Sequence, residues 1–223
     1  MGALISDFLS YKHSVYDEIS DLSKKEIDNF YSFILGGVKF NNSSPKLIMM
    51  LGISGAGKST FFNNAKQYYK DYAFLSGDEI MHNLQIFKDL KLLNKSSHND
   101  FRICETISRK LSFYILDYLI SNKANVFYDC GGLDLNKKNM VRYISDLGYK
   151  IEINAILADK KIAIDRVIKR HYKNGGGYIP VDLIEQNFNE VLPAINYYKQ
   201  FVDKINIYNN NNKIFLEETY IKR

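Results

Sequence analysis

The sequence predicts an α/β fold: a mostly parallel five-stranded sheet with helices on both faces, plus a helical extension at the N-terminus. Two observations lead to it. Short apolar runs alternate with longer segments of helical periodicity from residue 45 onward, and the first run leads directly into a glycine-rich loop. Alternating elements of this length form parallel sheets, whose ligands bind at the carboxyl ends of the strands. The residues that follow each strand are therefore the first candidates for function.

The N-terminal part is expected to be helical. Apolar residues recur at helical spacing within residues 4–35, as in Ile27, Phe30, Tyr31 and Ile34, and "GGVKFNNSSP" (36–45) then breaks the pattern. We therefore expect a helical segment and loop over residues 1–44 and the main domain over 45–223.

The remaining elements follow in alternation. Strands are expected at 45–51, 71–76, 124–130, 149–157 and 204–209, with 213–218 able to pair behind the last. Helices are expected at 59–69, 78–90, 101–121, 135–147, 159–173 and 181–201, the last bent or interrupted at Pro193. Residues 91–100 are expected to form a loop and 174–180 a turn.

The loop after the first strand carries the most specific motif. In "LGISGAGKST" (51–60), four positions fit G-x-x-x-x-G-K-[ST], the P-loop, and so predict a P-loop NTPase or kinase fold. Glycines let the backbone approach a phosphate, and the N–H groups and the following helix then hold it. We expect ATP (or GTP) and Mg²⁺, with Lys58 on the β and γ phosphates and Ser59 on the metal. The expected nucleotide-binding residues are Gly52, Ser54, Gly55, Ala56, Gly57, Lys58, Ser59 and Thr60.

A carboxylate follows the second strand. A P-loop kinase needs one to accept the proton of the attacking hydroxyl, and Asp78 lies at the strand end where this group is expected. Asp78 would also serve as the N-cap of helix 78–90, and the two roles are compatible. Asp78 and Glu79 are both candidate substrate-binding residues, although Glu79 also suits the first turn of a helix.

The third strand ends in "DCGG" (129–132). Asp129 is a candidate for holding Mg²⁺ through water or for binding the substrate, and Gly131 would let a ligand approach the backbone. Both residues also suit a simple turn.

A basic helix follows the fourth strand. Arg166 and Arg170 lie four residues apart, hence on one helix face, just before "GGG" (175–177). We expect a lid over about 159–180 that brings one of these arginines to the transferring phosphate. The alternative is a solvated basic face.

These residues together resemble the zeta-toxin family of P-loop kinases and the related polynucleotide kinases. The resemblance covers residues 25–210 and is carried by four segments: "SSPKLIMMLGISGAGKST", "FLSGDEIMHNL", "DRVIKRHYKNGGGYIPVDLI" and "KINIYNN". It implies transfer of the γ-phosphate to a hydroxyl of a nucleotide-sugar or nucleotide-type acceptor, with Asp78 as the catalytic aspartate. In zeta toxins the acceptor is a UDP-activated amino sugar and an antitoxin blocks the nucleotide site; in polynucleotide kinases the acceptor is a 5′-hydroxyl end.

The sequence also departs from the family pattern. Gly177 stands where a histidine is expected, "DCGG" replaces Glu-Gly-Thr, and Met81 and His82 replace a basic residue after the acidic pair. The missing threonine contacts substrate in zeta toxins, which leaves the acceptor open.

Composition leaves two alternatives open. The net charge of +5 is compatible with a polynucleotide 5′-hydroxyl kinase, although no strong basic run or stacking series marks a strand groove. A nucleotide-binding switch with slow ATP hydrolysis is the alternative of another class. The sequence shows no membrane span or secretory signal, and two cysteines suggest no disulfide framework, so a cytoplasmic location without membrane partners is expected.

Overall fold

The computed structural model describes residues 24–92, 98–174 and 179–222. The expected helix over residues 4–23 and most of the glycine turn lie outside these ranges. The strands form one sheet of six, in the order β2-β3-β1-β4-β5-β6. The chain divides into two compact units, Met1–Ser43 with Lys70–Phe127, and Ser44–Tyr69 with Tyr128–Arg223. The division at residue 44 into an N-terminal segment and a kinase domain stays a prediction.

The first unit is built around a long apolar helix. α6 (His98–Ser121) contributes the fully buried side chains of Leu111, Ile115 and Leu119. The unit also holds α2 (Lys24–Leu35), β2 (Ala73–Ser76), α4 (Gly77–Asn83), α5 (Gln85–Leu92) and the start of β3 (Val126–Asp129). β2 is fixed at its start by the Ala73 N–H, which donates to the Asn125 carbonyl over 2.8 Å.

Two sequence expectations in this unit were wrong in detail. The helix expected over 78–90 is two helices, because Leu84 adopts an extended conformation (φ −60°, ψ 134°) that buries its side chain. The expected loop over 91–100 is shorter, since α6 already begins at His98. The first difference follows from burial of the Leu84 side chain, which overrides local propensity.

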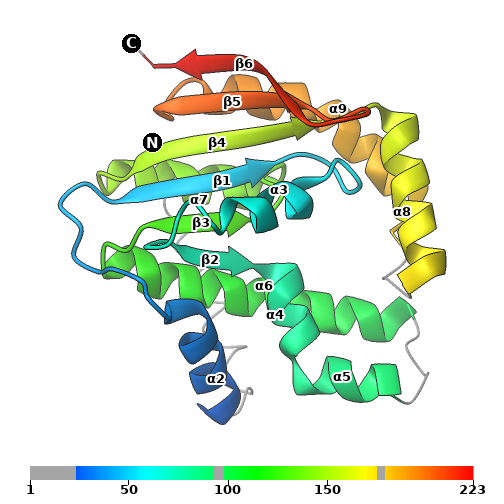
Figure 1. Ribbon diagram of the computed structural model, residues 1–223, viewed down its shortest axis with the longest axis horizontal. Coiled ribbons are helices and arrows are strands. Elements are labelled where there is room, and N and C mark those ends of the chain that lie inside the picture. The colour runs from blue at the N-terminus through cyan, green and yellow to red at the C-terminus, as the bar shows by residue number, and fades with distance from the viewer. Residues whose placement is uncertain (1–23, 93–97, 175–178, 223) are drawn as a thin grey trace. The chain divides into compact units, whose positions relative to one another are not determined.

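The second unit contains the phosphate loop and most of the sheet (Figure 1). β4 (Lys150–Leu157) pairs in parallel with β1 (Lys46–Leu51) and with β5 (Lys204–Asn209). Residues 47–51 of β1 are buried, as expected for a central parallel strand. The helices of the unit are α3 (Lys58–Ala65), α7 (Leu135–Asp146), α8 (Lys160–Asn174) and α9 (Val181–Tyr198).

The five expected strands are present, but the sheet has a sixth. β6 (Phe215–Ile221) runs antiparallel to β5 after a short turn, so the expected five-stranded sheet was one strand too small. The segment 213–218, which was expected to be able to pair behind the fifth strand, overlaps the start of this strand at residues 215–218. A hairpin is the natural result because the asparagine-rich turn between the two runs is short.

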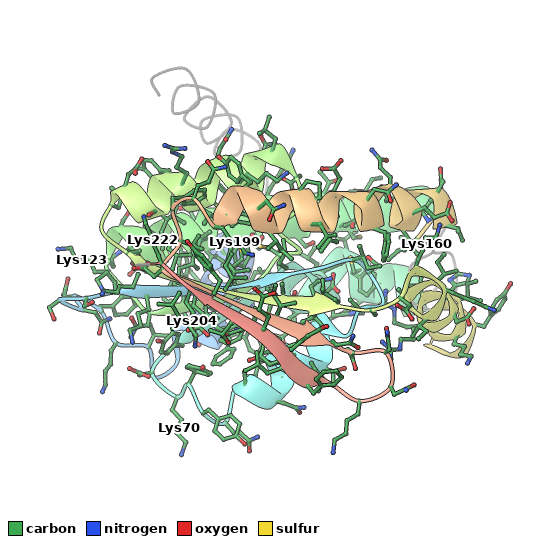
Figure 2. The ribbon with its side chains drawn as sticks, turned by 90° about the horizontal axis from the view of Figure 1, so that it is seen from above. Lys70, Lys123, Lys160, Lys199, Lys204 and Lys222 are labelled. Carbon is green, nitrogen blue, oxygen red and sulfur yellow. The ribbon has the colours of Figure 1, made fainter. Side chains whose placement is uncertain are left out.

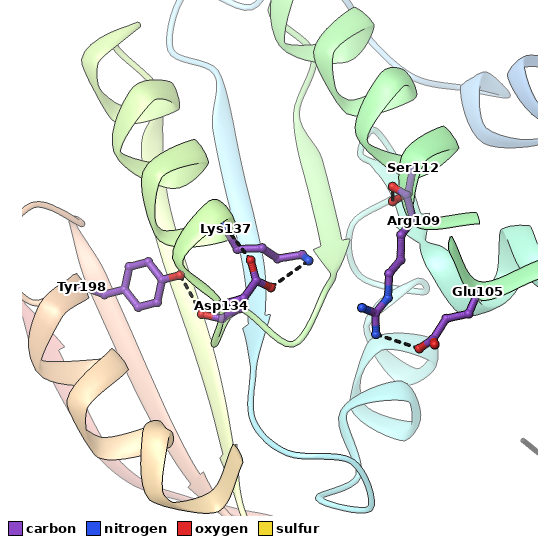
Figure 3. Close-up of polar contacts among 7 residues, drawn as sticks. Glu105, Arg109, Ser112, Asp134, Lys137 and Tyr198 are labelled. Atoms are coloured by element: carbon purple, nitrogen blue, oxygen red, sulfur yellow. Dashed lines mark hydrogen bonds and ion pairs between the residues drawn. The ribbon is translucent and has the colours of Figure 1, made fainter. Parts of the chain in front are cut away.

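Helix α9 is not interrupted at Pro193. The helix continues from Val181 to Tyr198 with the proline inside it, although proline cannot donate the helical hydrogen bond at its own position. Val191, Ala194 and Tyr198 are buried on either side of it and hold both turns against the core. The Tyr198 hydroxyl also donates to the Gly132 carbonyl over 2.8 Å (Figure 3).

Candidate functional site

The loop between β1 and α3 has the backbone that a phosphate-binding loop requires. Gly52 and Gly57 have φ values of 141° and 101°, in a region that side chains disfavour. A Cβ at Gly52 would collide with the Ile156 carbonyl, and one at Gly57 with the Asn210 side chain. The loop therefore depends on glycine for its conformation as well as for close approach to a ligand.

Lys58 is turned onto its own loop. Its Nζ donates to the carbonyl oxygen of Ile53 over 2.9 Å, which places the ammonium group across the loop. The remaining predicted residues lie around it: Ala56 is buried, Ser54 and Gly55 are half-buried, and Ser59 and Thr60 are exposed in the first turn of α3. Backbone N–H groups at the start of a helix and one lysine form a site for a polyphosphate.

The end of β3 meets the phosphate loop. The Ser59 Oγ donates to Asp129 Oδ2 over 3.3 Å, and the Gly52 N–H donates to the Gly131 carbonyl over 3.2 Å. A hydroxyl next to a carboxylate supplies the hard oxygen ligands that Mg²⁺ prefers, with phosphate oxygens and water completing its shell. Among the described residues no group of three His, Cys, Asp or Glu side chains forms a protein cage for a metal. The residues therefore fit Mg²⁺ held together with a phosphate.

Two residues outside the loop brace it. Asn210 Nδ2 donates to the Ala56 carbonyl over 2.7 Å, and the Arg166 guanidinium donates to the carbonyls of Gly55 and Asn211 over 3.4 and 3.1 Å. Arg166 thus contacts the phosphate loop through its backbone. Arg170, one turn further along α8, is exposed.

Asn210 and Asn211 are residues that the sequence reasoning did not select. The signal for Asn210 was the "YNN" (208–210) at the end of the fifth strand, which matches the family pattern but carries no obvious catalytic group. Asn211 lies one residue beyond it. Their role is visible only when the turn after β5 and the phosphate loop are seen in contact.

Asp78 and Glu79 begin α4 in the first unit. The cap of this helix is Ser76, whose Oγ accepts from the Glu79 N–H over 3.5 Å, so the expectation that Asp78 would be the N-cap was wrong. The helix starts one residue earlier than expected, at Gly77, which moves the capping position back. Asp78 is exposed and Glu79 is half-buried. The carboxylate of Asp78 is therefore not required to hold the helix end.

A polar cluster follows Asp129 at the start of α7 (Figure 3). Asp134 caps the helix through the Lys137 N–H (2.9 Å) and also accepts from Lys137 Nζ (3.1 Å). Burial raises the pKa of the Cys130 thiol to about 12, although Lys137 acts in the other direction. Burial lowers the pKa of Lys137, but Tyr128, Cys130 and Asp134 outweigh it and raise the pKa above its ordinary value. At neutral pH the thiol is thus protonated and the lysine charged.

One protein family matches most of the chain. A family model described as Zeta toxin matches residues 35–219, most of the chain. The search of the curated proteins found no significant match. No helix in the described part of the chain is long and apolar enough to cross a membrane.

Several solved structures share the fold. The PezAT toxin-antitoxin system of Streptococcus pneumoniae matches with a TM-score of 0.64 at 16% identity, over 87% of this chain and 81% of that one. AvrRxo1-ORF1:-ORF2 with ATP matches with a TM-score of 0.69 at 15% identity, over 89% of this chain and 66% of that one. The Pnkp1/Rnl/Hen1 RNA repair complex matches with a TM-score of 0.51 at 21% identity, over 70% of this chain and 47% of that one. At these identities the likeness concerns the fold.

Proposed function

The chain belongs to the Zeta toxin family, and from this premise we propose that it is a kinase that transfers the γ-phosphate of ATP or GTP to a hydroxyl of a nucleotide-sugar or nucleotide-type acceptor. The observation that carries the proposal is the phosphate loop, in which Lys58 lies across the loop on the Ile53 carbonyl and Ser59 lies beside Asp129. A loop of this form holds a nucleotide polyphosphate and its metal at one place.

Each residue has a distinct task in the proposed reaction. Lys58 and the N–H groups of the loop hold the β and γ phosphates, and Ser59 with Asp129 would hold Mg²⁺, which neutralises charge on the phosphate oxygens. Asp78 accepts the proton of the acceptor hydroxyl as it attacks, and Arg170 stabilises the charge on the transferring group. Glu79 and Gly131 are proposed to contact the acceptor.

Arg166 is proposed to position the phosphate loop, because its guanidinium is hydrogen-bonded to the carbonyls of Gly55 and Asn211. An arginine in this position holds the loop in its phosphate-binding form and carries positive charge close to it. With Arg166 in this task, Arg170 is the arginine of α8 that we propose for the transferring phosphate.

The direct test is transfer of a radiolabelled γ-phosphate to acceptors offered side by side: UDP-sugars, mononucleotides and 5′-hydroxyl oligonucleotides. We expect labelled UDP-sugar or mononucleotide with the wild type and no label with Lys58→Ala. Release of inorganic phosphate without transfer to any of them would support the nucleotide-binding switch instead.

A polynucleotide 5′-hydroxyl kinase is the second candidate, favoured by the shared fold with the RNA repair complex that contains Pnkp1. Several surface lysines are already paired with carboxylates, which gives this second candidate little support. Three of the lysines labelled in Figure 2 lie in ion pairs, Lys160 with Glu185, Lys199 with Glu218 and Lys204 with Glu152. A groove for a phosphate backbone needs lysines that are available to phosphates.

An antitoxin is the proposed protein partner, because the chain belongs to a toxin family and PezAT is described as a toxin-antitoxin system. A protein that closes the nucleotide site would silence the toxin by excluding the phosphate donor. Growth arrest on induced expression in a bacterial host, absent with Lys58→Ala, is the expected sign of a toxin. Equal growth of both strains at equal protein levels would count against this proposal.

A further inference from the structure

A pocket of about 290 Å³ adjoins the phosphate loop in the second unit. Ile53 forms part of its wall, and the carbonyl of the same residue accepts from Lys58 Nζ. The other apolar walls come from Ile156 at the end of β4 and from Phe188, Val191 and Leu192 on α9. The volume is near the lower end for small-molecule sites, about 300–1,000 Å³, and suits one ring system rather than a whole nucleotide.

Two of the apolar side chains that line the pocket remain partly in water. Phe188 is 39% exposed and Leu192 is 64% exposed, although both belong to a helix whose neighbouring Val191 is buried. Exposed apolar side chains that line a pocket are suited to covering the face of a flat ring.

The polar rim presents two kinds of hydrogen-bonding group. Asp159 and Glu217 contribute carboxylates, which only accept. The side-chain oxygens of Asn209 and Asn211 already accept backbone N–H groups, from Asn211 (3.1 Å) and Asp159 (2.7 Å). Because each oxygen is used in this way, the NH₂ group is the part of each amide that is left to bond a ligand. The rim combines carboxylate acceptors with amide donors.

A β-bulge accounts for the position of Glu217. Along the β5–β6 pair, Ile207 lies opposite Glu218 but Tyr208 lies opposite Leu216, so Glu217 is the extra residue. A bulge redirects the side chain that it carries. The next residue, Glu218, pairs with Lys199 at 4.0 Å and does not line the pocket. The two adjacent glutamates thus have different surroundings.

We propose that this pocket holds the base of the phosphate donor and that Glu217 selects guanine over adenine. The inference rests on the proposed kinase function and specifies its donor. Guanine presents the N1–H and N2–H₂ donors side by side, which a carboxylate accepts together, and an O6 acceptor for an amide NH₂. Adenine presents an acceptor at N1, which a carboxylate repels. Its one amine is the only donor group beside that acceptor.

Calorimetry on the full chain tests this base preference. The ligands are the β,γ-imido analogues of GTP, ATP and ITP in Mg²⁺ buffer. We expect the guanine analogue to bind the wild type on the order of 10-fold more tightly than the adenine analogue, the size of one bidentate base contact. The inosine analogue, which lacks the N2 amine, should fall between them. Glu217→Gln should abolish most of the preference, because an amide cannot accept both donors.

Glu218→Gln is the matched control, since it makes the same chemical change one residue away, and it should keep the wild-type preference. Thermal melting of both variants checks that the fold is intact. An adenine preference in the wild type, an unchanged ratio in Glu217→Gln, or an equal loss in both variants would overturn the inference. Binding of all three analogues without preference removes the base assignment alone, whereas no binding of any analogue removes the proposed kinase function as well.

Discussion

Asn210 Nδ2 donates to the carbonyl oxygen of Ala56 over 2.7 Å, so the turn after β5 is hydrogen-bonded to the middle of the phosphate loop. The two residues are 154 positions apart in the chain. The same side chain lies where a Cβ at Gly57 would have to go. The shape of the loop is therefore set partly by a residue that lies outside the motif.

The first prediction concerns this bond. Asn210→Ala should weaken binding of ATP and GTP alike, because the Ala56 carbonyl loses its donor and the loop can relax. The cost to stability should be about 1 kcal/mol, the usual net value of one hydrogen bond. Calorimetry and thermal melting measure the two effects.

Two further variants show whether the bond itself matters. Asn210→Asp keeps the shape but cannot donate, so it should bind nucleotide no better than the alanine variant. Asn212→Ala, at an exposed position of the same turn, should behave like the wild type. Wild-type affinity in Asn210→Asp would show that the bond is incidental.

The second prediction concerns Lys58. Lys58→Ala removes the positive charge from the β and γ phosphates, so nucleotide binding should weaken and phosphate transfer should largely disappear while the protein stays folded. Calorimetry, the transfer assay and circular dichroism measure these three properties. Lys66→Ala, just after α3, is the control and should transfer phosphate normally. Unchanged affinity and transfer in Lys58→Ala would remove the loop from the mechanism.

The third prediction separates the two arginines of α8. Arg166→Ala should mainly raise the dissociation constant for nucleotide, because it releases the carbonyls of Gly55 and Asn211. Arg170→Ala should lower kcat by on the order of 10³-fold with a small effect on nucleotide affinity, as for an arginine that stabilises transferring charge. Lys169→Ala, an exposed cation between them, is the control. If Arg170→Ala keeps the wild-type kcat, the exposed face of α8 has no part in catalysis.

The fourth prediction concerns Asp78. Asp78→Asn should lower transfer to the acceptor by about 10²-fold or more, the usual size of a general-base contribution, and leave nucleotide affinity unchanged. Its melting temperature should not fall, because Ser76 caps α4. Ser76→Ala should show the reverse, a loss of about 1 kcal/mol in stability from the missing cap. Asp89→Asn on α5 controls for the loss of an exposed carboxylate. Wild-type transfer by Asp78→Asn would make Asp129 the next candidate for the base.

The fifth prediction concerns the reactivity of Cys130. Its pKa is raised to about 12, so in the folded protein the thiolate is scarce at both pH 7 and pH 9. Alkylation by iodoacetamide should be slow at pH 7 and at pH 9, and should become fast at both when the protein is unfolded in denaturant. Mass spectrometry of the labelled peptide distinguishes Cys130 from the buried Cys104. Rapid labelling of Cys130 in the folded protein at pH 7 would contradict the raised pKa.

Much of the fold was predictable from local sequence. The apolar run of β1, the glycine pattern of the following loop and the helix after it are encoded within residues 45–65, because strand burial, positive φ and helix-terminal phosphate binding are local properties. The same holds for the alternation of strands and helices, which predicted the α/β class and five of the six strands in the sheet.

Other features required side chains from distant parts of the chain. The break at Leu84 and the continuity of α9 through Pro193 depend on what each helix buries, and local propensity favoured the opposite in both cases.

The sequence by itself determined that a phosphate loop with Lys58 and Ser59 is present, since that motif is contiguous and the positive φ of its glycines is a local property. Only the tertiary structure decided what surrounds it: Asp129 at Ser59, Arg166 at Gly55 and Asn210 at Ala56. Parallel strands bring their carboxyl ends to one edge of the sheet whatever their separation in the chain. The contacts among those ends depend on side-chain reach and on turns such as the one after β5, which no local pattern specifies.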